Sequence, residues 1–500
     1  MRIGLKSFTI RLNIFNRDKK EFRMAQIQNN YIAGNWVAGV TSIENRNPSN
    51  HAEIIGEFAQ ASSAQVQEAL SAAKQAQLVW QATGLEARLQ VLQAIGDEMI
   101  ARCDELGKLL SQEEGKPFAE GRGEVYRAGQ FFQYYAAQVL RQMGETADSV
   151  RPGVEIETRR EPVGIVAIIS PWNFPTATAS WKIAPALAFG NAVIWKPANL
   201  TPASAVALTE IIAKQNLPDG LFNLVMGSGA EVGEQLINST EVDAISFTGS
   251  LQVGRRIAQA AAGNLTKFQL EMGSKNALIV LDDADLDMAA DCAVGGAFGG
   301  TGQKCTASSR LIVTAGVHDA FVEKVKQRMA NLKVGDALAE GVTIGPVVDG
   351  KQLQQNRDYM QLAEDEGCEL VCGGEIDDSQ GYFMTPALFV NTTNQMRINR
   401  EEAFAPIACV IKVADYEEAL ATLNDTEYGL TGGICTQSLK YASHFKRHAK
   451  TGCVMVNLPT AGTDYHVPFG GRKNSSYGSR EQGQYAEEFY TEVKTSYIKA

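Results

Sequence analysis

The segment VGIVAII, residues 163–169, is the first of five short apolar or β-prone runs in the middle of the chain. The other four runs are residues 192–195, 222–225, 244–247 and 267–270. Helix-like segments, such as residues 202–215 and 254–262, separate them. Because strands that alternate with helices form parallel sheets with helical crossovers, we predict a doubly wound α/β fold.

The regions on either side extend this prediction. Residues 62–142 are rich in Ala, Glu, Gln, Leu and Lys with apolar residues about 3.6 positions apart, which predicts helices. Later strand-like runs, with a helix-like segment at residues 319–332 between two of them, predict a second α/β unit; these runs are residues 276–280, 310–313 and 408–413. Residues 154–162 and 488–497 read as extended segments.

The composition is that of a globular protein. Five hundred residues exceed what one hydrophobic core usually organises, so we expect two or three subdomains. The net charge of −11 argues against nucleic acid or an anionic membrane as the partner. No apolar run approaches the roughly 20 residues of a membrane span. The eight cysteines are scattered without zinc-type spacing, so we expect no metal site, no disulfide framework and a cytoplasmic protein.

Residues 1–23 differ from the rest of the chain. They carry seven basic residues against Asp18 and Glu21, and they lack the apolar core of a secretory signal. A basic, acid-poor start also occurs in organelle transit peptides. Because Met24 follows directly, we favour an upstream start codon or a disordered extension over targeting.

The segment GQKCT, residues 302–306, places Cys305 directly after a glycine-rich run. Small residues let the backbone approach a ligand and leave a thiol uncrowded, although alone the segment favours a buried structural cysteine. Two other segments complete a set for covalent catalysis. They are LEMG (residues 270–273), which carries Glu271, and PWNFP (residues 171–175), which carries Asn173.

These segments resemble the aldehyde dehydrogenase superfamily, whose members oxidise aldehydes with NAD(P) through a cysteine thioester. Further matches are WKPA (195–198), FTGS (247–250), EEAFAP (401–406) and PFGGRK (468–473), in the family's order. The resemblance implies a Rossmann-type cofactor domain (24–149 and 163–274) and a catalytic domain (275–475). It also implies a small sheet from residues 150–162 and 476–500 that joins subunits into a homotetramer or dimer.

The resemblance also implies the catalytic roles. Cys305 attacks the aldehyde to give a thiohemiacetal and then a thioester, and the Asn173 amide with the Cys305 N–H stabilises the alkoxide. Glu271 is the base for hydrolysis to a free acid, because members that acylate coenzyme A generally lack this residue. From the residues alone, Asn173 could equally form a turn, and Glu271 could pair with Lys275. A catalytically silent, crystallin-like relative is the alternative of another class.

The expected cofactor is NADP or NAD. Residues 247–250 fit a strand that turns into a helix whose N-terminus binds pyrophosphate, or a capped helix start with Ser250 as the N-cap. The glycines of residues 227–233 are weak evidence, because their spacing departs from the dinucleotide fingerprint. The implied cofactor residues are Ser170, Trp172, Lys196, Ala198, Asn199, Gly229, Gly233, Phe247, Thr248, Gly249, Ser250, Val253, Met272, Glu402 and Phe404.

Asn199 bears on cofactor choice. NAD-preferring members often carry Glu at this position, where it accepts hydrogen bonds from the ribose hydroxyls. The neutral Asn199 removes the repulsion that a carboxylate exerts on a 2′-phosphate, so we expect NADP to be accepted. Preference between NADP and NAD stays open.

The expected substrate is an aldehyde or semialdehyde. The implied substrate residues are Phe174, Thr178, Trp181, Lys304, Thr306, His466 and Phe469, with residues 463–467 at the mouth. Succinic semialdehyde dehydrogenases hold the substrate carboxylate with two arginines, and this chain has Trp181 and Gly299 at those positions. Residues 452–468 look most like 2-oxoglutarate semialdehyde (2,5-dioxovalerate) dehydrogenases, with succinate semialdehyde or aliphatic aldehydes as alternatives.

Four basic residues are candidates for the acid end of such a substrate: Lys304, Arg310, His466 and Arg160. The chain also departs from family habit at two positions near the site. Ser476 stands where Gly is common, and Ala405 replaces a usual Gly, so we expect a small change in the loop near the nicotinamide because Ala takes positive φ less readily.

Overall fold

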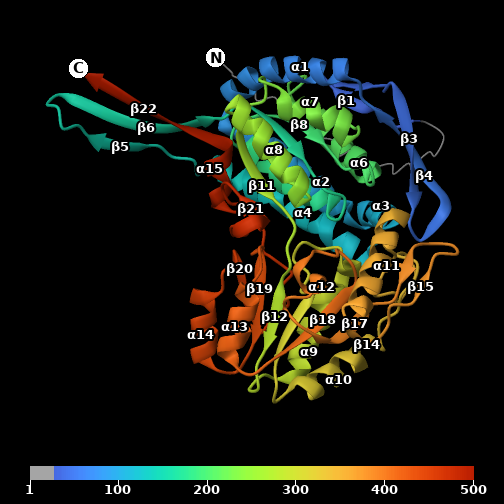
Figure 1. Ribbon diagram of the computed structural model, residues 1–500. Coiled ribbons are helices and arrows are strands. Elements are labelled where there is room, and N and C mark those ends of the chain that lie inside the picture. The colour runs from blue at the N-terminus through green and yellow to red at the C-terminus, as the bar shows by residue number, and fades with distance from the viewer. Residues whose placement is uncertain (1–26, 500) are drawn as a thin grey trace, which may run out of the picture.

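The computed structural model describes residues 27–499, and its strands build two large sheets with helices around them (Figure 1). The expected extension, residues 1–23, lies outside the described residues. The first sheet has the order β2-β1-β9-β8-β7-β10-β11-β21, with β9 to β11 parallel. Its strands are β1 (Asn30–Ile32), β2 (Asn35–Val37), β7 (Ile165–Ile169), β8 (Ala192–Lys196), β9 (Phe222–Leu224), β10 (Ala244–Thr248), β11 (Lys267–Glu271) and β21 (Ser476–Tyr477).

The predicted helices confirm the α/β class and cover this first sheet. Residues 62–142 form four helices, and Pro117 is the N-cap of the fourth, where proline costs no helical hydrogen bond. The helices are α1 (Ser63–Ala82), α2 (Leu85–Ala101), α3 (Cys103–Glu114), α4 (Phe118–Val139), α5 (Pro175–Ala188), α6 (Pro202–Ala213), α7 (Glu234–Asn238) and α8 (Leu251–Asn264). Helix α4 packs on α2, α3 and α5, so it connects the outer helices to the segment that follows β7.

The second sheet has the order β14-β17-β18-β13-β12-β19-β20, and only β14 runs antiparallel to its neighbour. Its strands are β12 (Ala277–Val280), β13 (Arg310–Thr314), β14 (Glu369–Cys372), β17 (Ala387–Thr392), β18 (Ile407–Val413), β19 (Thr431–Cys435) and β20 (Cys453–Val456). Its helices are α9 (Leu286–Phe298), α10 (His318–Met329), α11 (Gly350–Asp365), α12 (Arg397–Arg400), α13 (Tyr416–Asn424) and α14 (Leu439–His448).

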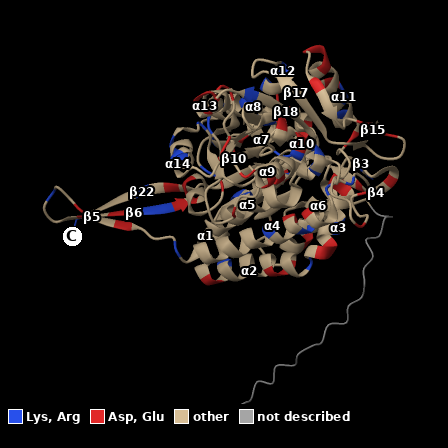
Figure 2. Cartoon of the chain, turned by 90° about the horizontal axis from the view of Figure 1, so that it is seen from below, with Lys and Arg blue, Asp and Glu red and all other residues tan. Residues whose placement is uncertain are grey.

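A third, small sheet projects from the body (Figures 1 and 2). It consists of β5 (Glu145–Asp148), β6 (Val154–Pro162) and β22 (Thr491–Lys499), in the order β22-β6-β5. The prediction that residues 488–497 are extended is wrong at its start, because helix α15 (Glu487–Tyr490) ends there before β22 begins. The apolar side chains of Val493 and Tyr497 are exposed on β22.

Two features of the described chain complete the outline. The hairpin β3 (Thr41–Asn47) and β4 (Asn50–Gln60) was not predicted, and it packs against α3 and α6. Among residues 27–499, none of the helices has the length and apolar character that crossing a membrane requires.

Candidate active site

The nucleophile segment follows α9 through a tight turn, residues 299–302. Gly300, Thr301 and Gly302 all have positive φ (59°, 56° and 68°). A Cβ atom at Gly302 would overlap the backbone carbonyl of Ala405, so only glycine lets the two segments pack. The glycine-rich run therefore lets the backbone before Cys305 pack closely against residues 402–405. A small change was expected in the loop at Ala405 because Ala takes positive φ less readily than Gly; here Ala405 does not have positive φ, and the preceding Phe404 does (φ 54°).

Asn173 lies beside the nucleophile segment. It follows β7, and its buried Nδ2 donates to the backbone oxygen of Gln303, at 2.9 Å. Gln303 is two residues before Cys305, so the amide of Asn173 points at the segment that carries the thiol. The structure thus places the amide of Asn173 against the nucleophile segment, where the predicted role requires it.

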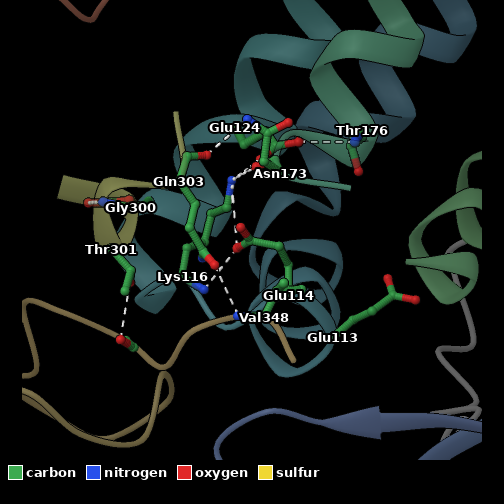
Figure 3. A network of polar contacts seen from close by, with 12 residues as sticks. Glu113, Glu114, Lys116, Glu124, Asn173, Thr176, Gly300, Thr301, Gln303 and Val348 are labelled. Atoms are coloured by element: carbon green, nitrogen blue, oxygen red, sulfur yellow. Dashed lines mark hydrogen bonds and ion pairs between the residues drawn. The ribbon is translucent and has the colours of Figure 1, made fainter. Parts of the chain in front are cut away.

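A buried charged cluster, formed by Glu114, Lys116 and Glu124, supports Asn173 from behind (Figure 3). The Lys116 ammonium donates to the Asn173 backbone oxygen and to Glu124 Oε2, both at 2.6 Å. The other oxygen of Glu124 accepts from the backbone N–H of Thr176, at 3.0 Å, in the first turn of α5. This cluster was not predicted; its one signal in the sequence is that Glu114 and Glu124 occupy buried positions of α3 and α4.

Glu271 ends β11 and is buried. The Ser476 hydroxyl of β21 donates to Glu271 Oε2 at 2.6 Å, and the two residues are direct partners across the strands. Burial raises the pKa of Glu271 to about 8, and the Ser476 hydrogen bond opposes that rise. Within residues 27–499, Lys275 makes no ion pair with Glu271, so the paired alternative is wrong. Ser476 departs from family habit without strain, at φ −152°.

Cys305 and two buried carboxylates share one environment. Burial, followed by the nearby carboxylates of Glu402 and Glu271, raises the pKa of Cys305 to about 12. Burial also raises the pKa of Glu402 to about 7, although its Oε1 accepts from the Ser274 N–H at 2.8 Å. Lys304 does not bond the thiol, because its ammonium donates to the Gly295 oxygen at 3.2 Å. Near neutral pH, Cys305 and most of Glu271 therefore hold their protons, and Glu402 is partly ionised.

The expected cofactor residues gather at the carboxyl ends of β7, β8 and β10. The stem of Lys196 lies 3.8 Å from where a Cβ atom at Gly233 would be. The Trp195 indole donates to Ser170 Oγ at 2.8 Å, which fixes the end of β7 beside β8. Gly229 and Gly233 bound a short helical turn, η1 (Gly229–Gly233), and Asn199 Nδ2 donates to Gln60 Oε1 at 3.3 Å.

The remaining cofactor residues form the turn after β10 and the segment after α12. Ser250 is the N-cap of α8, because its hydroxyl accepts from the Val253 N–H at 3.4 Å, as the capping alternative expects. The first N–H groups of the helix remain free for a phosphate. Met272 packs against α8 where a Cβ atom at Gly254 would clash. Phe404 stands edge-on to Trp172, with ring centroids 5.5 Å apart.

These residues fit a nicotinamide dinucleotide. The buried Lys196 ammonium donates only to the Pro197 oxygen (3.0 Å) among the described residues, and burial lowers its pKa to about 8. The buried Thr248 hydroxyl has no partner in the part of the chain that the structure describes. Unused donors beside a helix N-terminus match the phosphate and ribose oxygens of such a cofactor.

Most of the expected substrate residues pack among other side chains, whereas His466 is exposed. Trp181 packs on Phe469, with ring centroids 5.8 Å apart, and the Phe174 ring lies 3.9 Å from the Lys116 ammonium. Thr178, one turn after Phe174, and Thr306, directly after Cys305, are both buried. His466 is exposed and stands edge-on to Tyr465.

Two of the four residues expected at the acid end of the substrate, Arg310 and Arg160, have other contacts. Arg310 is buried, and its guanidinium is used up by acceptors of the second sheet region: Lys275 O, Asn394 Oδ1, Thr422 O and Leu423 O, at 2.9–3.2 Å. Arg160 lies on β6 in the projecting sheet, where it donates to Thr491 Oγ1 at 3.0 Å. The donors of Arg310 are therefore engaged within the second sheet region, and Arg160 belongs to the projecting sheet and not to the segments that carry Cys305, Asn173 and Glu271.

A protein-family sequence profile described as the aldehyde dehydrogenase family matches residues 36–496. The chain belongs to the aldehyde dehydrogenase family. It is 40% identical to the alpha-ketoglutaric semialdehyde dehydrogenase of Bacillus subtilis over 477 residues, which cover 94% of this chain and 98% of that one. It is 34% identical to the NADP(+) succinate-semialdehyde dehydrogenase of Escherichia coli over 465 residues, which cover 93% and 96%.

A solved structure supports the same assignment. Betaine aldehyde dehydrogenase from Staphylococcus aureus, determined with NAD+, superposes with a TM-score of 0.92 at 32% identity and covers 94% of this chain and 95% of that chain. The aldehyde dehydrogenase fold predicted from the sequence is thereby confirmed. The protein is an NAD(P)-dependent, aldehyde-oxidising enzyme, and a silent structural relative is not the right description.

Proposed function

We propose that this aldehyde dehydrogenase oxidises 2,5-dioxovalerate to 2-oxoglutarate, with Cys305 as nucleophile, Asn173 as oxyanion donor and Glu271 as base. The observation that carries the mechanism is the contact of Asn173 with the nucleophile segment, together with the electrostatic influence of Glu271 on the Cys305 thiol. The 40% identity to the Bacillus subtilis semialdehyde dehydrogenase supports the substrate.

The proposed chemistry begins at sulfur. The Cys305 thiol gives up its proton to ionised Glu271, which passes it to solvent, and the sulfur adds to the aldehyde carbon. The Asn173 amide exchanges the Gln303 oxygen for the new alkoxide. NAD(P), when bound by the residues around Lys196 and Glu402, supplies the hydride acceptor that this oxidation needs. A thioester then remains on Cys305. Glu271 takes a proton from water as the water oxygen adds to the thioester carbon, and the acid leaves as sulfur regains a proton.

For the cofactor, we propose that NADP is accepted. Asn199 and Gln60 form a neutral pair next to the Lys196 segment, so no carboxylate of that pair repels a 2′-phosphate. Steady-state kinetics with both cofactors test this. A ratio of kcat/KM for NAD over NADP above about 100 would refute it.

The substrate is tested with purified enzyme, 2,5-dioxovalerate, succinic semialdehyde and pentanal, with Cys305→Ala as the inactive control. We expect the highest kcat/KM for 2,5-dioxovalerate. A much higher value for pentanal would contradict the proposed substrate and leave the aldehyde dehydrogenase assignment intact.

For organisation, we propose that the unit around the first sheet binds cofactor, that the unit around the second carries the nucleophile, and that the projecting sheet joins copies into a dimer or tetramer. The exposed Val493 and Tyr497 of β22 support the assembly through the projecting sheet. Light scattering at several concentrations measures the assembly, and a monomer throughout would contradict it.

All eight cysteines are free, which supports a reducing, cytoplasmic setting.

A further inference from the structure

A continuous wall of aromatic rings extends outward from the base Glu271. Gly470 lies directly against it, because a Cβ atom at Gly470 would stand 2.7 Å from Glu271 Oε1. The preceding residue, Phe469, packs on Trp181, and the Trp181 ring centroid is 5.9 Å from that of Phe131. Phe131 in turn contacts Tyr465 edge-on, at 6.4 Å. These contacts form one chain of packed rings from Glu271 to the loop at residues 463–467.

Arg127 stands at the outer end of this wall. It lies on α4, one turn before Phe131, and its guanidinium carbon is 5.3 Å from the Tyr465 ring centroid. The side chain is half-buried, yet within residues 27–499 it makes no hydrogen bond and no ion pair. By comparison, the more deeply buried Arg88 donates through Nη2 to the Trp80 and Gln81 oxygens at 2.7–2.8 Å, and its Nε has no partner among the described residues.

A second donor without a partner belongs to the same wall. Trp181 Nε1 is shielded from solvent and has no acceptor among the described residues. A shielded donor that lacks an acceptor costs stability, so an acceptor supplied by a ligand is favoured there. A guanidinium over an aromatic face presents its edge N–H groups to a carboxylate in a bidentate manner. The two donors thus match a substrate with a carboxylate and a neighbouring carbonyl oxygen.

We propose that Arg127 binds the substrate carboxylate and that Trp181 Nε1 donates to the adjacent 2-oxo oxygen. The inference rests on the proposed function, because it assigns the recognition of an acid-bearing aldehyde to that site. It also accounts for Trp181 and Gly299, which replace the two arginines expected in a succinic semialdehyde dehydrogenase. Lys304, Arg310 and Arg160 have acceptors of their own, and Arg127 does not.

Arg127→Met tests the carboxylate assignment with the full-length enzyme. The measured quantity is the ratio of kcat/KM for 2,5-dioxovalerate to kcat/KM for pentanal, which has the same chain length and no acid. We expect this ratio to fall about 100-fold, mainly through KM, because truncation removes a charge-assisted pair. Arg127→Lys should recover part of the loss. Arg122→Met, an exposed position on α4 paired with Asp104, is the matched control.

Trp181→Phe tests the second donor, since it keeps the ring and removes the N–H. The same ratio should fall about fivefold, as for one neutral hydrogen bond. An unchanged ratio in Arg127→Met, or equal losses on both substrates, would overturn the role of Arg127. If the wild-type enzyme instead prefers succinic semialdehyde and Arg127→Met still lowers its kcat/KM relative to butanal, the proposed substrate fails while the carboxylate assignment stands.

Discussion

Replacing Lys116 by Met removes the one positive charge of the buried Glu114–Lys116–Glu124 cluster (Figure 3). Two charge-assisted hydrogen bonds of 2.6 Å are lost, to Glu124 and to the Asn173 oxygen. Removing one partner of a buried pair costs about 3–5 kcal/mol, because the other charge is left uncompensated. Glu124 keeps the Thr176 N–H at 3.0 Å, so we expect the lower end, about 3 kcal/mol of unfolding free energy.

Urea unfolding at fixed protein concentration measures this loss. The variants are Lys116→Met, Glu124→Gln and the double variant, with exposed Lys108→Met as the matched control. The neutral amide that Glu124→Gln introduces needs no counter-charge, so the double variant should recover about 2 kcal/mol relative to additivity. A loss below about 1 kcal/mol in Lys116→Met, or strict additivity, would show that the pair does not stabilise the fold as the geometry indicates.

Three further predictions concern the site. Ser476→Gly removes the hydrogen bond that favours ionised Glu271, so the pKa rises above about 8 and the increase of kcat with pH moves to higher pH; an acid shift would contradict this. Asn199→Glu should lower kcat/KM for NADP relative to NAD by about 10-fold or more, which cofactor kinetics would show. Arg310→Met should lower the urea midpoint while KM for 2,5-dioxovalerate stays constant; a raised KM would restore Arg310 to the substrate site.

The parallel strands were predictable because they are buried on both faces and therefore read as apolar runs. Strand β7, for example, occupies residues 165–169 of the first quoted segment. The hairpin β3–β4 escaped prediction, since its residues are mixed in polarity and its pairing has register shifts. The end of α15 was missed because β22 follows it directly, and local pattern places element boundaries poorly.

Among the site residues, the sequence motif agrees with the position of Asn173, and prediction failed where tertiary contacts decide. The placement of Asn173 beside the nucleophile segment agrees with the motif. Arg310 was misjudged because a basic residue near Cys305 in sequence says nothing about its acceptors, which lie up to 113 positions away. Lys116 was missed for the same reason, since its partner Asn173 is 57 positions away in the sequence.

The raised pKa values of the site imply an order for its charges. An ionised carboxylate at Glu402 or Glu271 raises the pKa of Cys305, and by reciprocity a thiolate opposes ionisation of both carboxylates. The pocket therefore favours one negative charge at a time near neutral pH. Once the sulfur is bonded to carbon it no longer titrates, so ionisation of Glu271 no longer competes with formation of a thiolate. The base thus becomes easier to ionise at the stage that needs it, when water attacks the thioester, and the Ser476 hydroxyl is already placed to stabilise that carboxylate.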